Sequence, residues 1–338
     1  MRRRESGGRV TVLLAAALML ALSLAVAPGA GASGDVREKS VGRQERVQEG
    51  EGVDRPTALR QADFADVKYG PHERNVLDFW KAESEKPAPV LLYFHGGGFV
   101  GGDKRAVGGY VERCLAEGIS VASANYRFVR GREPVTFPGP HRDGARVVQF
   151  LRHKSKEWNI TPDRIALVGS SAGANMALWI GLHDDLADPE SEDPVARLSS
   201  RVSCVVSHGG QTSNDPRFIL ERIGGSPRVH PSLFPAYGVS SWEELDTPDV
   251  GRLVEESSAI SHATAGDPAV YLAYGGFLAG TPLPKDTPIG VSIHHAMFGK
   301  VLKEKLDPLG VECHLYYKES PAPRNAEMDF LKKHLGIE

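Results

Sequence analysis

The chain has 338 residues, and its 40 Lys and Arg against 43 Asp and Glu give a formal net charge of -3. This balance excludes a strongly basic nucleic-acid-binding protein, and 41% apolar with 25% charged residues excludes a chain that is disordered throughout. Three Cys residues without a Cys-x-x-Cys pair exclude a dense disulfide framework and a zinc ribbon.

The N-terminus has the pattern of a secretory signal peptide. Several Arg residues precede an apolar run from Val10 to Val26, and Ala30-Gly31-Ala32 fits the small-x-small cleavage pattern. We therefore expect residues 1–32 to be removed and the mature protein to be secreted or periplasmic, without membrane contact. An uncleaved membrane anchor is the alternative, but the run is slightly short for a membrane span.

The rest of the chain predicts a disordered leader over residues 33–62, followed by one α/β domain over 63–338. Runs of strand character cover 66–69, 75–80, 89–95, 119–126, 164–169, 202–208, 269–274 and 311–317. Helical patterns cover 109–117, 141–158, 174–182, 296–306 and 328–335. This alternation predicts a mostly parallel sheet with helices on both faces, and the irregular residues 209–265 predict a lid insert.

The segment Gly169-Ser170-Ser171-Ala172-Gly173 matches the Gly-x-Ser-x-Gly pattern of a nucleophile elbow. A predicted strand ends before it and a predicted helix follows it, as the pattern requires. Such a sharp turn projects the hydroxyl of the middle Ser above the sheet, so Ser171 is the candidate nucleophile. A Gly and Ser turn without chemistry is the alternative for this pentapeptide taken alone.

A second motif, His95-Gly96-Gly97-Gly98, follows directly on a predicted buried strand. A Gly run lets backbone N–H groups approach a substrate closely. We expect the N–H groups of Gly96, Gly97 and Ala172 to form an oxyanion hole, and His95 to be structural rather than a base. A phosphate-binding loop is the rival, but the Gly-x-x-x-x-Gly-Lys-Ser/Thr pattern is absent.

Taken in this order, three segments resemble the α/β-hydrolase superfamily, most of all its hormone-sensitive-lipase and carboxylesterase branch. They are His95–Phe99, Asn125-Tyr126-Arg127 and Gly169–Asn175. The segments Tyr69-Gly70, Leu77–Trp80 and Gly101–Lys104 are similar to those of secreted acetyl-xylan and feruloyl esterase-like members. The resemblance extends from about Val67 to Leu182 and implies the α/β-hydrolase fold and acyl chemistry. It implies no cofactor, and we expect no metal ion.

The third member of a catalytic triad is not in its usual place. In the family that this chain resembles, the acid follows the strand before last. Here the strand Val270–Tyr274 runs into a Gly-rich segment, and the first carboxylate available is Asp286. Asp286 can serve if residues 276–285 form an inserted loop, and a solvated loop residue is the alternative.

The usual base is also missing, because no His follows the last strand before the terminal helix. Glu319 lies near that position, but a carboxylate is a weaker partner for a Ser hydroxyl. Triads are defined by geometry rather than by sequence order, so a His elsewhere can serve. The candidates are His294 and His295, of which His295 is preferred, and His208 at the end of a strand.

These features predict a secreted serine ester hydrolase that acts on a small-molecule or polysaccharide ester, with Ser171, His295 and Asp286 as its triad. Two alternatives remain open at this stage. The first is a hydrolase-fold binding protein that keeps the pocket without a base. The second is an amidase or formamidase.

Two further predictions concern packing. Phe234, Tyr237 and Trp242 of the insert either stack on a sugar or aryl ring or pack inside the lid, and packing is the commoner outcome. Asp143 lies in a predicted helix, where we expect a structural pairing with Arg127 or with a backbone group.

Overall fold

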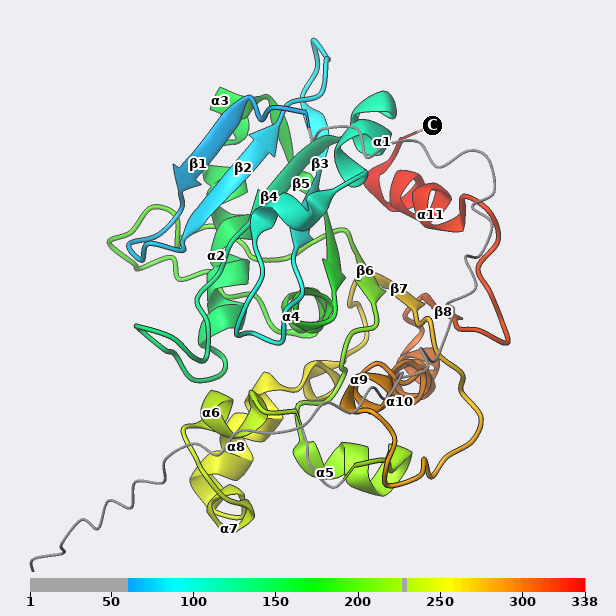
Figure 1. The fold of residues 1–338 in the computed structure, drawn as a ribbon. Coiled ribbons are helices and arrows are strands. Elements are labelled where there is room, and N and C mark those ends of the chain that lie inside the picture. The colour runs from blue at the N-terminus through cyan, green and yellow to red at the C-terminus, as the bar shows by residue number, and fades with distance from the viewer. Residues whose placement is uncertain (1–59, 227–229, 338) are drawn as a thin grey trace, which may run out of the picture. The chain divides into compact units, whose positions relative to one another are not determined.

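The structure, a computed structural model, describes residues 60–226 and 230–337. At its centre is an eight-stranded sheet with the order β1-β2-β4-β3-β5-β6-β7-β8 (Figure 1). The strands are β1 (Phe64–Lys68), β2 (Val76–Trp80), β3 (Ala88–Phe94), β4 (Ser120–Ala124), β5 (Ile160–Ser170), β6 (Cys204–His208), β7 (Ala269–Ala273) and β8 (Cys313–Tyr316). The predicted signal peptide and nearly all of the predicted leader lie outside the described residues.

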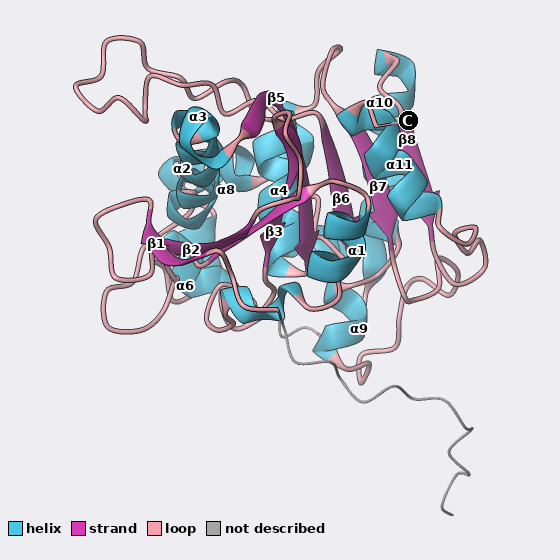
Figure 2. Cartoon of the chain, turned by 90° about the horizontal axis from the view of Figure 1, so that it is seen from above, coloured by secondary structure: helices cyan, strands magenta, loops and turns pink. Residues whose placement is uncertain are grey.

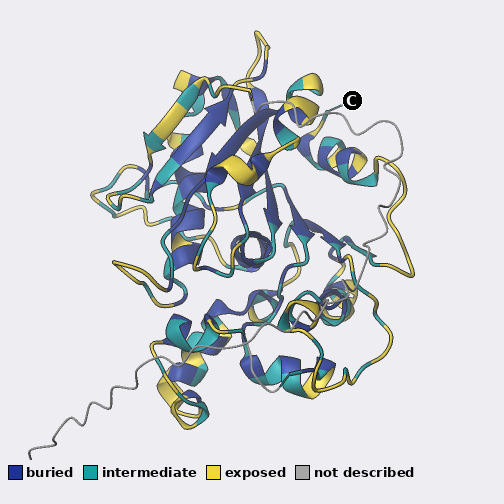
Figure 3. Ribbon diagram, in the orientation of Figure 1, coloured by how far each residue is buried: buried dark blue, intermediate teal, exposed yellow. Residues whose placement is uncertain are grey.

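Strands β3 to β8 are parallel, and β1 and β2 form an antiparallel edge. Every residue of β3 is buried, as the continuous apolar sequence of this strand requires. Figure 3 shows the same burial across the central strands. A sheet of such strands is stable only when helices cover both of its faces.

Helices do cover both faces (Figure 2). They are α1 (Tyr110–Ala116), α2 (Gly139–His153), α3 (Ser155–Trp158), α4 (Ala172–Leu182), α10 (Met297–Leu306) and α11 (Ala326–Leu335). Side chains of α2, α4 and α10 share one apolar cluster with Leu92, whereas those of α1 and α11 share another with Leu91. The adjacent residues Leu91 and Leu92 point to opposite faces because side chains alternate along a strand. This arrangement confirms the predicted fold class.

The chain between β6 and β7 forms a series of short helices at the lower end of the sheet in Figure 1. They are α5 (Pro216–Phe218), a π-helical turn (Ile219–Ile223), α6 (Leu233–Tyr237), α7 (Trp242–Leu245), α8 (Pro248–Ser257) and a 3-10 turn (Ala259–His262). After β7 comes α9 (Ile289–Ile293). Within the described ranges, no helix is both long and apolar enough to cross a bilayer.

The aromatic residues of this insert are packing residues. The rings of Phe234 and Trp242 meet edge to face, with centroids 5.4 Å apart. Tyr237 is buried, and its hydroxyl donates to the Asn214 carbonyl oxygen over 2.8 Å. Phe234 and Trp242 are partly buried against the apolar core and Tyr237 is bonded within the insert, so we assign these residues to packing rather than to substrate contact.

An ion pair ties the segment after β4 to α2. Asp143 of α2 is 5% exposed and accepts hydrogen bonds from the backbone N, Nε and Nη2 of Arg127 at 2.9, 2.9 and 2.7 Å. This bidentate geometry satisfies both carboxylate oxygens. Asp143 therefore has the structural pairing that its sequence position predicts.

Candidate active site

Ser171 occupies the turn between the end of β5 and the start of α4. Its φ of 52° and ψ of -117° are unusual for a residue with a side chain, which marks a strained turn. The two flanking glycines are required sterically, because a Cβ on Gly169 would overlap the Gly173 backbone and one on Gly173 would overlap the Phe94 backbone. The sequence thus folds locally into an elbow that exposes the Ser171 hydroxyl.

His294 is the side chain that meets this hydroxyl. Its Nε2 lies 2.8 Å from Ser171 Oγ, and its Nδ1 lies 2.8 Å from the carbonyl oxygen of Gly290. A carbonyl oxygen only accepts, so Nδ1 carries the ring proton and Nε2 presents a lone pair to the hydroxyl. This is the tautomer that a general base for Ser171 needs.

The structure corrects the predicted preference for His295. The His295 side chain is 3% exposed, and its Nδ1 accepts the backbone N–H of Met297 over 3.1 Å. Its Nε2 is buried and has no hydrogen-bond partner among the described residues. Burial lowers the pKa of His295. The ring of this residue therefore faces the interior, and that of its neighbour faces Ser171.

Asp286 is exposed, and within the described ranges no hydrogen bond or ion pair joins it to His294. The predicted triad of Ser171, His295 and Asp286 is thus not assembled. The carbonyl of Gly290 takes the orienting position instead. A carboxylate is not needed to select the ring tautomer, because any fixed acceptor at Nδ1 does so.

The two remaining sequence candidates are engaged elsewhere. His208 Nε2 lies 3.0 Å from Glu327 Oε2, and the Tyr110 hydroxyl donates to Glu327 Oε1 over 2.6 Å. Burial opposes the ionisation of Glu327, but the hydrogen bonds from His208 and Tyr110 bring its pKa below the usual value. Glu319 accepts the backbone N–H of Leu278 over 3.2 Å. Neither residue is a partner for Ser171.

The glycine run after β3 lies against the elbow. A Cβ on Gly96 would come within 3.3 Å of Ser171 Cβ and 3.0 Å of the Ser170 carbonyl oxygen. Among the described residues, the N–H groups of Gly96 and Gly97 donate in no hydrogen bond. Ala172 is the first residue of α4, where the N–H has no acceptor within the helix. The three predicted oxyanion donors therefore belong to segments that meet at Ser171.

His95 fixes the orientation of this run. The ring is fully buried, stacks on Tyr126 with centroids 4.4 Å apart, and its Nδ1 lies 2.7 Å from the Gly96 carbonyl oxygen. Burial lowers the pKa of His95 to about 4, so the ring is neutral near pH 7. The C=O and N–H of a trans peptide point in opposite directions, so this contact turns the Gly97 N–H away from His95. His95 is structural, as its position predicts.

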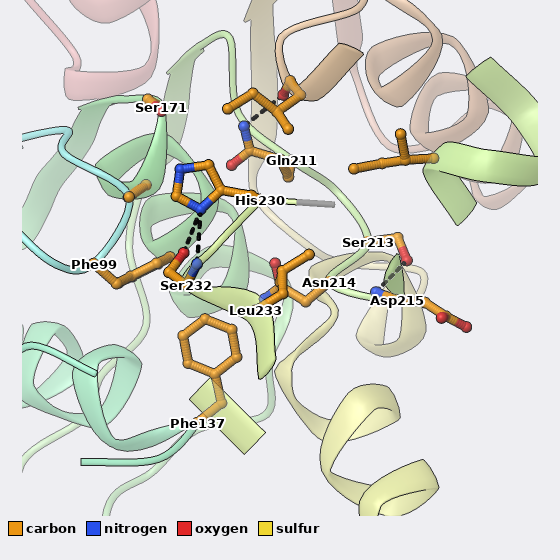
Figure 4. A pocket seen from close by; sticks show the side chains of 14 residues that line it. Phe99, Phe137, Ser171, Gln211, Ser213, Asn214, Asp215, His230, Ser232 and Leu233 are labelled. Atoms are coloured by element: carbon orange, nitrogen blue, oxygen red, sulfur yellow. Dashed lines mark hydrogen bonds between the residues drawn. The ribbon is translucent and has the colours of Figure 1, made fainter. Parts of the chain in front are cut away.

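A pocket opens beside Ser171 (Figure 4). Its apolar wall comes from Phe99, Phe137, Ile219, Leu233 and Ile293, and its polar groups include Gln211, Asn214 and His230. Sequence reasoning missed both His230 and Phe137, because neither belongs to a motif. His230 lies over the glycine run, since a Cβ on Gly98 would lie 3.0 Å from its Nε2.

Known proteins match this chain around these motifs. The BD-FAE family model matches residues 77–214, which contain the glycine run and the elbow. Esterase LipC of Mycobacterium tuberculosis is 27% identical over 193 residues, which cover 56% of this chain and 40% of LipC. Esterase LipQ of the same organism is 31% identical over 222 residues, which cover 63% of this chain and 48% of LipQ. The chain spans less than half the length of either relative.

Two solved structures share the architecture. The acetyl ester-xyloside bifunctional hydrolase from Caldicellulosiruptor lactoaceticus superposes with a TM-score of 0.56 at 23% identity, covering 78% of this chain and 85% of that one. A truncated carbohydrate esterase from gut microbiota superposes with a TM-score of 0.62 at 17% identity. The match covers 81% of this chain and 96% of that one. At these identities the likeness concerns the fold. The sheet, the elbow and these matches show that the chain has the α/β-hydrolase fold.

Proposed function

We propose that the protein is a serine hydrolase of carboxylic esters. The observation that carries this proposal is the 2.8 Å contact between Ser171 Oγ and the Nε2 of His294. A Ser hydroxyl is a weak nucleophile without an adjacent base. The absence of a base from its usual place left a non-catalytic binding protein as an alternative, and the position of His294 supports the enzyme.

The proposed reaction has two halves. Ser171 Oγ attacks the ester carbonyl carbon while His294 Nε2 takes the hydroxyl proton, and the negative oxygen meets the N–H groups of Gly96, Gly97 and Ala172. The bond to the alcohol oxygen breaks, and His294 returns the proton to the leaving alcohol. In the second half, water gives a proton to His294 and attacks the acyl group on Ser171, which releases the carboxylic acid and restores the hydroxyl.

The orienting group in this proposal is a backbone carbonyl. The oxygen of Gly290 lies 2.8 Å from His294 Nδ1 and holds the ring in the productive tautomer. It carries a partial charge rather than a full one, so it stabilises the imidazolium less than a carboxylate would. The site is therefore a Ser–His dyad, in which Asp286 has no part.

The proposed substrate is a short acyl ester on a carbohydrate, met outside the cytoplasm. Support comes from the names of the two similar structures, which are an acetyl ester-xyloside hydrolase and a carbohydrate esterase. The pocket offers the apolar rings of Phe99 and Phe137 beside the amide of Gln211, which suits an acyl group attached to a hydroxylated partner. The signal-peptide pattern of residues 1–32 supports export to such a substrate.

Hydrolysis of p-nitrophenyl acetate by the mature chain, beside Ser171→Ala, tests the reaction class. We expect activity that disappears in the variant, and labelling of the wild type by a fluorophosphonate probe. Release of acetate from acetylated xylan, compared with deacetylated xylan, tests the substrate. Faster turnover of p-nitroacetanilide than of the matching ester would identify an amidase. Equal background rates in both proteins, without labelling, would contradict the proposal.

A further inference from the structure

Three side chains of metal-ligand type come together away from Ser171. In the described part of the chain, the one group of three such residues whose ligand atoms all lie within 4.8 Å is His183, Glu256 and His262. His183 follows the last residue of α4, Glu256 lies near the end of α8, and His262 ends the 3-10 turn after α8. The helix α4 has 11 residues, so the group lies about 16 Å from the elbow.

The first imidazole is held with one nitrogen free. His183 Nδ1 lies 2.9 Å from the carbonyl oxygen of Asp184, so Nδ1 carries the proton and Nε2 keeps its lone pair. That Nε2 lies 3.4 Å from Glu256 Oε1, which is itself an acceptor. Two acceptor atoms that face each other at this distance are satisfied by a cation between them.

The second imidazole is oriented by a backbone group of the same acidic residue. His262 Nε2 lies 2.8 Å from the carbonyl oxygen of Glu256, so Nε2 carries the proton and Nδ1 is left as the acceptor. Trp179 Nε1 donates to the same carbonyl oxygen over 2.6 Å. The centroids of the Trp179 and His183 rings lie 4.3 Å apart. Ligand His residues of metal sites are oriented by second hydrogen bonds of this kind.

We propose that His183, Glu256 and His262 form a binding site for a divalent transition metal, with Zn²⁺ as the preferred ion. Two imidazole nitrogens and one carboxylate oxygen are a common protein ligand set for Zn²⁺, and water completes the tetrahedron. Ca²⁺ and Mg²⁺ prefer oxygen ligands alone and are not suited to this set. All three residues are partly exposed, and a surface groove that includes Glu256, Ser261 and His262 provides the entry path.

The bound ion would fasten the segment after α8 to the end of the elbow helix. Arg142 is its competitor, because its Nη2 lies 3.9 Å from the same Glu256 Oε1. Removal of this guanidinium leaves the ligands in place and frees the carboxylate oxygen. Substitution of Arg142 should therefore raise the affinity for Zn²⁺, whereas substitution of a ligand should lower it.

The test is Zn²⁺ titration of the mature, chelator-treated protein by calorimetry, followed by thermal unfolding with and without Zn²⁺. We expect one ion per chain and a rise of about 5 °C or more in melting temperature at saturating Zn²⁺. His183→Gln, Glu256→Gln and His262→Gln should each weaken binding at least about tenfold, and Co²⁺ should lose its visible ligand-field bands in these variants. His153→Gln, an exposed His outside the group, is the matched control.

Arg142→Met should tighten Zn²⁺ binding. This variant keeps the ligands, so it tests the proposal even if a ligand variant fails to fold. Unfolding of each variant without metal shows whether it has folded. The proposal is overturned if the wild type binds no stoichiometric Zn²⁺. It is also overturned if folded ligand variants bind Zn²⁺ as tightly as His153→Gln, or if Arg142→Met binds it no more tightly than the wild type.

Discussion

His294 Nε2 lies 2.8 Å from Ser171 Oγ, although 123 positions separate the two residues along the chain. The Gly290 carbonyl on the other side of the ring fixes the proton on Nδ1. Two short contacts thus place and orient the group that can activate the nucleophile.

Asp286 should be dispensable. It is exposed, and the orienting contact to His294 comes from a backbone carbonyl that side-chain substitution does not remove. We expect Asp286→Asn to leave kcat/KM for p-nitrophenyl acetate within about twofold of the wild type, because no interaction of the transition state is lost. A loss of about a hundredfold or more would show that a carboxylate orients the base in solution.

The approach of the glycine run to the elbow should be needed for turnover. A methyl group at Gly96 would press on Ser170 and Ser171, whereas one at Gly101 meets no atom within 4 Å. We expect Gly96→Ala to lower kcat about a hundredfold by displacing the oxyanion donors, and Gly101→Ala to keep wild-type activity. Similar kcat values for the two variants, measured with the same ester, would contradict the proposed oxyanion hole.

Most of the fold and the position of Ser171 can be predicted from the sequence, because both depend on local patterns. Three such patterns are the apolar run of β3, the glycines after it and the order strand, Ser and helix at Ser171. Each determines the structure of the chain within about ten residues of the pattern. The parallel sheet then follows from the alternation of strands and helices. The predicted helix over 141–158 divides into α2 and α3, which local periodicity did not show.

The base and the metal ligands depend on distant parts of the chain. His294 and His295 are neighbours, and successive residues near a helix end point in directions about 100° apart. The packing of α9 decides which of the two rings faces Ser171, and this packing cannot be predicted from sequence periodicity. His183, by contrast, meets Glu256 only through the packing of α4 against the insert, so no sequence spacing indicates the group.

The ion pair of Asp143 and Arg127 should contribute strongly to stability. Asp143 is buried, and its removal leaves a guanidinium without its bidentate partner. We expect Asp143→Ala to lower the free energy of unfolding in urea by about 3 kcal/mol. The matched control is Asp249→Ala, which breaks the exposed pair with Arg252 and should have no measurable effect. Equal losses in the two variants would refute a special role for the buried pair.

Acid should destabilise the fold through His141. This ring is fully buried, its Nε2 lies 2.8 Å from Asn175 Oδ1, and burial lowers its pKa to about 4. In the unfolded chain this side chain has a pKa of about 6.5. Between these values the unfolded state binds a proton that the folded state rejects, so stability falls as the pH is lowered through this window, by about 3 kcal/mol in total.

The check is urea unfolding of wild type and His141→Gln across this pH range. The variant should show a shallower loss of stability, with the remaining slope due in part to His95, whose pKa burial also lowers to about 4. Parallel pH profiles for the two proteins would show that His141 has the same pKa in the folded and unfolded states, which would contradict this prediction.

The most direct test of the central claim compares two neighbouring substitutions, His294→Gln and His295→Gln, by kcat/KM for p-nitrophenyl acetate below the melting temperature of both. Only His294 contacts Ser171, so we predict a loss of about a thousandfold or more in His294→Gln and activity near that of the wild type in folded His295→Gln. Retained activity in His294→Gln, or a matching loss in His295→Gln, would contradict the assignment of His294 as the base.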